Sequence, residues 1–100
     1  MIQKDQLKIQ SLVSELLPVV RDLVSKGNGS IALNSLVMEV TGKAPVEHER
    51  EMSAQSVHGS LILNQIGEEL IIHLMSSHPH KNFRVLSSWG RSPSLVVSDK

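Results

Sequence analysis

Histidines, serines and carboxylates are the side chains of this 100-residue chain whose chemistry could support a metal site or a reaction. His73, His78 and His80 are separated by four residues and then by one, a spacing that matches no zinc-binding signature. The chain contains no cysteine, so neither a thiolate zinc site nor a disulfide framework can form. These residue types and spacings therefore predict no bound metal.

No serine lies in a sequence typical of a catalytic nucleophile, which needs a strained turn, an oriented histidine and a carboxylate. Residues 27–30, GNGS, lack the lysine and the preceding strand of a phosphate-binding loop. Glu68 and Glu69 are adjacent in the chain, so their carboxylates diverge and do not form a general acid–base pair. We expect neither enzymatic activity nor a cofactor.

The composition is typical of a small globular domain with an aliphatic core, because 40% of the residues are hydrophobic but only 2% are aromatic. A length of 100 residues favours one domain over residues 1–100. Charged residues interrupt positions 1–20, and no apolar run reaches membrane-spanning length. We expect a cytoplasmic protein that does not enter a membrane.

An amphipathic helix is predicted over residues 3–26, where apolar side chains recur at intervals of three and four. Pro18 cannot donate a backbone hydrogen bond, so it predicts a kink or a division into two shorter helices. The apolar side of this helix, which includes Leu16 and Val20, is also a candidate surface for a homodimer.

A second helix is predicted from Ser30, as its N-cap, through Thr41, with Gly42 as its C-terminal cap. Residues 43–52 are charged and have little apolar periodicity, so they predict a connection with at most one helical turn. Residues 53–66 are predicted to form a third helix with a small, uncharged outer face.

The C-terminal part is predicted to form β structure. Residues 70–75 are nearly all apolar and too few for an independent helix, which favours a buried strand, and residues 82–89 alternate more clearly. A loop joins these runs as a hairpin, which a strand over residues 94–98 can extend. In a second assignment, residues 61–98 instead form a four-stranded antiparallel meander, and sequence pattern separates the two poorly.

The order helix, short helix, helix, glycine and hairpin resembles winged helix-turn-helix regulators over about residues 4–88. The resemblance implies an α+β, winged helix-like fold of three helices followed by a β hairpin, with a helical part over 3–66 and a β part over 68–98. In that family the third helix enters the major groove and the wing contacts the backbone or minor groove. Glutamine can pair with an adenine edge, and serine can bond to bases or phosphates.

The candidate DNA-binding residues come from this third helix and from the locally basic C-terminal third, which carries no acid over residues 76–98. They are Ser53, Gln55, Ser56, Ser60, His80, Lys81, Arg84 and Arg91.

Two functional hypotheses follow from the charge pattern. One is a small DNA-binding transcriptional regulator or accessory protein whose partner is duplex DNA. The other is a protein-docking adaptor or inhibitor of phage or plasmid type, which contacts a protein partner through the neutral helix face or the region of Trp89. The winged helix resemblance makes the first the leading hypothesis, whereas a formal net charge of zero and the absence of lysine and arginine from residues 53–66 favour the second.

Overall fold

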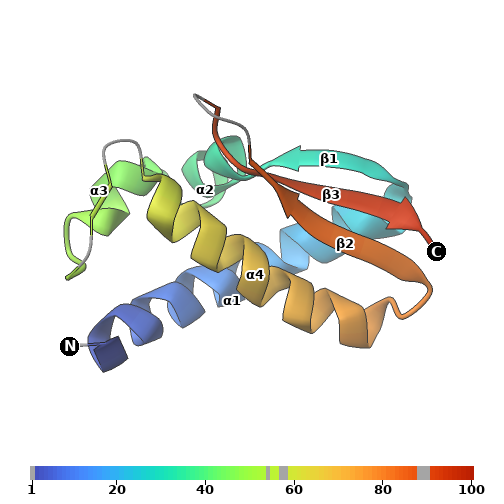
Figure 1. Cartoon of the computed structure of the whole chain (residues 1–100), viewed down its shortest axis with the longest axis horizontal. Helices are drawn as coiled ribbons and strands as arrows, with labels where there is room; N and C mark the ends of the chain where they lie inside the picture. Colours follow the sequence, from blue (N-terminus) through green and yellow to red (C-terminus); the bar gives the residue numbers. More distant parts are fainter. Residues whose placement is uncertain (1, 54, 57–58, 88–90) are drawn as a thin grey trace.

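Four helices and three strands are formed by the residues that the computed structural model describes, 2–53, 55–56, 59–87 and 91–100 (Figure 1). Their order is α1 (Ile2–Lys26), β1 (Gly29–Ala32), α2 (Leu33–Thr41), α3 (Pro45–Glu49), α4 (Ser60–Ser77), β2 (Lys81–Leu86) and β3 (Ser94–Asp99). The expected α+β class is confirmed. Within the described ranges, no helix has the length and hydropathy needed to cross a membrane.

The three strands form one antiparallel sheet in the order β1-β3-β2. Val97 in the central strand pairs with Gly29 on one side and with Phe83 on the other. Leu95 and Val97 point into the core and are buried. Because β1 follows α1 and β3 is the last element, the sheet joins segments that are far apart in the sequence (Figure 1).

The first predicted helix is confirmed as α1, and it forms one helix with Pro18 inside it. The predicted division into two helices is therefore wrong. Pro18 is exposed, whereas Leu16, Val20 and Val24 are fully buried in the core of the same chain. Their burial offsets the hydrogen bond that proline cannot make. Since Leu16 and Val20 are covered by their own core, they are not available to a second subunit.

The second helix begins later than predicted. Ser30, the expected N-cap, lies in β1, and α2 follows with Ala32 at its N-cap position. The strand was missed because its pairing partner, β3, lies at the other end of the sequence. The predicted C-terminal cap is confirmed, since Gly42 has a left-handed φ of 76° and its N–H bonds to the carbonyl of Met38. The expected helical turn in the connection is α3.

The third helix is displaced from its predicted position. Residues 60–77 form α4, so neither the strand over 70–75 nor the meander exists. In the apolar run over residues 70–75, Leu70 and Leu74 are buried, whereas Ile72 and Met75 are exposed. Such a run cannot be assigned by alternation alone. The predicted hairpin is also displaced, because β2 pairs with β3 rather than with residues 70–75.

Candidate functional site

The residues expected on a DNA-contacting helix lie mostly in the connection before α4. Ser60 is the first residue of α4 and is exposed, whereas Ser53, Gln55 and Ser56 precede the helix. The Ser53 N–H donates to both carboxylate oxygens of Asp5, at 3.1 and 3.2 Å. The recognition helix predicted over residues 53–66 is therefore wrong in its first part, because tertiary contacts hold Ser53, Gln55 and Ser56 outside a helix.

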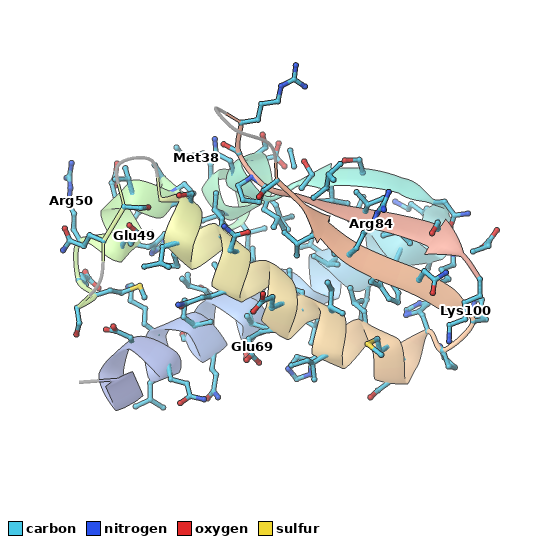
Figure 2. The ribbon with its side chains drawn as sticks, viewed as in Figure 1. Met38, Glu49, Arg50, Glu69, Arg84 and Lys100 are labelled. Atoms are coloured by element: carbon cyan, nitrogen blue, oxygen red, sulfur yellow. The ribbon has the colours of Figure 1, made fainter. Side chains whose placement is uncertain are left out.

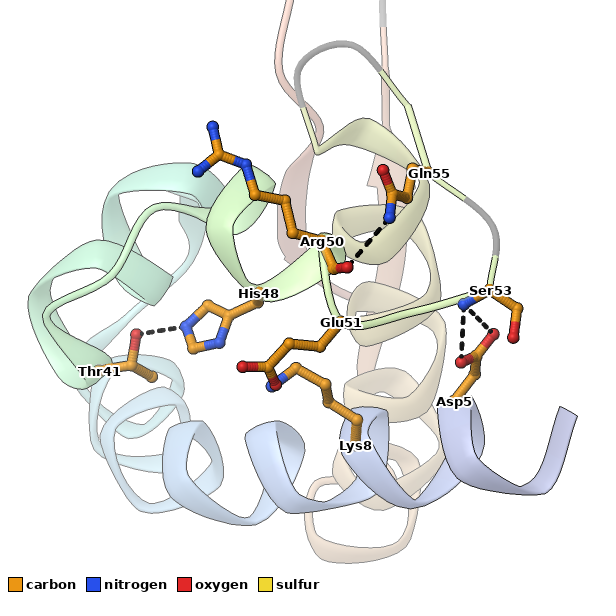
Figure 3. A network of polar contacts seen from close by, with 8 residues as sticks. All are labelled: Asp5, Lys8, Thr41, His48, Arg50, Glu51, Ser53 and Gln55. Carbon is orange, nitrogen blue, oxygen red and sulfur yellow. Dashed lines mark hydrogen bonds and ion pairs between the residues drawn. The ribbon is translucent and has the colours of Figure 1, made fainter. Parts of the chain in front are cut away.

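Gln55 and Ser56 form hydrogen bonds with other residues of the same molecule. The Gln55 Nε2 group donates to the carbonyl of Arg50 at 3.0 Å (Figure 3). Ser56 donates both its N–H and its hydroxyl to the carboxylate of Glu49. In this arrangement neither side chain extends from a helix toward a nucleic acid.

Glu49 is the buried anchor of this connection, with 0% of its surface exposed. Its carboxylate also accepts the N–H of Ile62 at 3.0 Å, and the Ser56 hydroxyl accepts the N–H of Leu61 at 3.3 Å. These two N–H groups belong to the first turn of α4, which Gly59 cannot cap with a side chain. A buried carboxylate thus caps the helix and complements its dipole.

The basic residues proposed for the wing are distributed around the sheet. His80 lies in the turn before β2, and Lys81 begins β2, where its ammonium donates to the Asn28 side chain at 2.9 Å. Arg84 is exposed on β2 (Figure 2), and Arg91 is exposed in the connection between β2 and β3. This connection, rather than the predicted loop between residues 75 and 82, joins the two strands of the hairpin. Trp89 lies outside the described residues.

A polar network joins α1 to α2 and α3 around His48, which is 6% exposed (Figure 3). Its Nε2 atom lies 2.8 Å from the Thr41 hydroxyl, which donates to the carbonyl of Val37 at 2.7 Å. A hydroxyl has one proton to give, so the His48 Nε2–H donates to Thr41 and Nδ1 carries the lone pair. Nδ1 is buried and has no hydrogen-bond partner among the described residues.

Burial and nearby positive charges disfavour the protonated form of the His48 ring. Burial lowers the pKa of His48 below 6.5, and the nearby positive charges of Lys8 and Lys43 lower it further. Lys8 forms a 2.7 Å ion pair with Glu51, and this hydrogen bond lowers the pKa of the Glu51 carboxyl. The hydrogen bond between His48 and Thr41 joins α3 to α2, and the ion pair between Lys8 and Glu51 joins α1 to the residues that follow α3.

A hollow of 540 Å³ opens beside this network, lined by residues of α1 and of the segment from Thr41 to Glu51. Its lining contains two lysines and two glutamates, whose formal charges cancel. The described residues contain no group of three or more His, Cys, Asp or Glu side chains placed to bind a metal ion.

The outer face of α4 has a different character. Gln65, Glu68, Ile72 and Met75 are all exposed and recur at helical spacing, so they form one stripe along the helix. Ile72 is 60% and Met75 59% exposed. Sequence reasoning missed this surface because it assigned residues 70–75 to a buried strand.

The N-terminal half of the stripe borders a groove of 310 Å³ between α4 and α1. Gln65, Glu68 and Glu69 line it from α4, and Asp5, Gln6 and Ile9 line it from α1. Figure 2 shows Glu69 on the side of α4 that faces α1. Three carboxylates and no lysine or arginine form this lining, so the groove is acidic.

Comparison with known proteins gives no match, whether to a family model, to a curated protein or to a solved structure.

Proposed function

We propose that this protein is a winged helix-like docking module that binds a protein partner through the exposed face of α4. The support for the winged helix likeness is the chain order, in which α4 directly precedes the β2–β3 hairpin. In winged helix-turn-helix regulators the helix before the hairpin is the one that enters the DNA groove. The corresponding face of this protein is the stripe containing Gln65, Glu68, Ile72 and Met75.

The composition of that stripe carries the proposal. Nonspecific DNA affinity comes mainly from lysine and arginine that neutralise phosphates, and α4 contains neither. Glu68 and Glu69 would instead repel the phosphate backbone. Ile72 and Met75 expose apolar surface of the kind that protein interfaces bury. A protein partner therefore fits this helix better than duplex DNA.

Affinity capture tests the proposal. The tagged protein would be incubated with a nuclease-treated extract of the cells that produce it, beside Ile72→Glu and Met38→Glu variants. Met38 is an exposed apolar residue on α2 and provides the matched control. We expect a stoichiometric protein that the wild type and Met38→Glu retain and Ile72→Glu loses. Equal retention by all three, or no retained protein, would contradict docking through α4.

DNA binding through the hairpin is a second candidate, because Arg84 and Arg91 are exposed and residues 76–98 contain no acid. Fluorescence anisotropy with a random duplex across a salt series distinguishes it. Binding at low salt that disappears in an Arg84→Glu/Arg91→Glu variant would favour DNA. We expect no such binding.

A further inference from the structure

The acidic groove and the apolar end of the α4 stripe follow one another along the same helix. Glu68 borders the groove, Ile72 follows one turn later and Met75 almost one turn after that. The negative charge is concentrated at one end, where Asp5 and Glu69 join Glu68, and the apolar surface lies at the other. The exposed face of α4 therefore has an acidic end and an apolar end.

We infer that this face is a docking site for a basic amphipathic helix of a partner protein, an inference that rests on the proposed docking function. The partner helix would place apolar side chains over Ile72 and Met75 and lysines or arginines over the groove. Charge complementarity carries the choice, because the six groove-lining residues include three acids and no base.

The shape of the site favours a helix over an extended peptide. An extended peptide gains affinity by pairing its backbone with the free edge of a sheet. The groove lies between α1 and α4, whose backbone groups are already bonded within each helix. A helix can instead lay its side chains into the groove between two helices. The stripe from Gln65 to Met75 is about 15 Å long, enough for about three turns of a partner helix.

Selection from a displayed library of random 20-residue peptides tests the partner's chemistry. We expect the wild-type protein to enrich peptides with a net positive charge and apolar residues at helical spacing. Binding of an enriched peptide, measured by fluorescence anisotropy, should weaken at least about tenfold in Ile72→Glu, as for a central interface residue. Met38→Glu should leave it unchanged. Circular dichroism and thermal unfolding would verify that each variant folds.

A charge reversal provides the sharper arm. The Glu68→Lys/Glu69→Lys variant should bind more weakly the peptide that the wild-type protein enriched. When this variant is used as the bait in a new selection, it should enrich acidic peptides instead. Glu39→Lys, an exposed charge change on α2, is the control. Enrichment of acidic or neutral peptides by the wild type, or unchanged specificity after reversal, would overturn this inference. A partner still captured through Ile72 would then leave the docking function standing, whereas failure of that capture would remove both.

Discussion

Glu49 shows how a single buried side chain decides where a helix begins. Its carboxylate binds the Ser56 N–H and hydroxyl and the Ile62 N–H, and none of it is exposed to water. Residues 55 and 56 therefore remain in the connection, and the first turn of α4 gains hydrogen-bond acceptors that its own N-cap residue cannot supply.

Replacement of Glu49 by alanine should destabilise the fold by about 2–4 kcal/mol, because the part-buried N–H of Ser56 and the buried N–H of Ile62 would lose their carboxylate acceptor. Urea unfolding followed by circular dichroism measures this difference. Glu47→Ala removes an exposed carboxylate from the same short helix and should change stability by less than about 0.5 kcal/mol. Equal stability of the two variants would contradict the capping role of Glu49.

His48 should make stability depend on pH in a defined window. Its pKa in the folded protein is below 6.5, so as pH falls below 6.5 the unfolded chain gains a proton that the folded chain binds less readily. The free energy of unfolding therefore decreases as the pH is lowered from 6.5 to the pKa of the folded protein. It is regained when the pH is raised above 6.5. The cause is the cost of a charged ring that is buried near Lys8 and Lys43.

Urea unfolding between about pH 5 and 7.5 measures this slope. The lower limit lies above 4.5, the ordinary pKa of a glutamate carboxyl, and the pKa of Glu51 is lowered further, so this carboxyl does not titrate in the measured range. His48→Gln retains a side-chain donor for Thr41 but cannot titrate, so the slope should be reduced. A slope that is unchanged in His48→Gln would show that another group causes it.

At the scale of elements, Gly67 sets how closely α4 approaches the sheet. A Cβ atom at this position would lie 2.6 Å from Cγ2 of Val85 and 3.1 Å from Cδ1 of Leu33. The sequence suggested that Gly67 ends a helix before a strand. In the structure it lies inside α4, where the missing side chain makes room for β2.

Gly67→Ala should therefore destabilise the protein by about 1–3 kcal/mol, although alanine favours helix formation, because the core must accommodate an extra methyl group. In a Val85→Ala background much of that clash is removed, and the same change should cost less or become stabilising. A double-mutant cycle measured by urea unfolding gives the coupling. Additive effects would show that the contact with Val85 does not limit the approach.

Local signals predicted some elements and could not predict others. The apolar periodicity of residues 3–26 and the glycine at position 42 are local signals that depend on a few neighbouring residues. Both predictions are confirmed, the first as α1 and the second as the C-terminal cap of α2. A local signal for α4 was also present, because Ile62, Ile66, Leu70 and Leu74 recur at four-residue intervals and are all buried. It was obscured by the apolar residues Ile72 and Met75, which are exposed.

The remaining features depend on contacts between distant parts of the chain. The strand β1 exists because β3 pairs with it, and the start of α4 depends on Glu49. The eight candidate site residues come from two sequence patterns, an uncharged segment and a basic one, but the fold divides them between a connection, a helix end, the turn before β2 and the hairpin. The acidic groove brings Asp5 beside Glu68, and no spacing rule relates two positions so far apart.

At the scale of the whole molecule, the strand order makes segments that are distant in the sequence depend on one another. The central strand, β3, is the last element, and it separates β1 from β2. It also contributes Leu95 and Val97 to the core that the helices share. The helical part and the β part distinguished in the sequence should therefore fold as one unit.

A fragment of residues 1–86, which lacks β3, should lose cooperative thermal unfolding and much of its helical circular dichroism signal. Without β3, both β1 and β2 lose their ladder partner, and the helices lose the apolar surface of Leu95 and Val97. A chain ending at Ser98 removes only exposed residues and should unfold much like the full chain. If the 1–86 fragment unfolded cooperatively near the full-length midpoint, the helices would be shown to fold without the sheet.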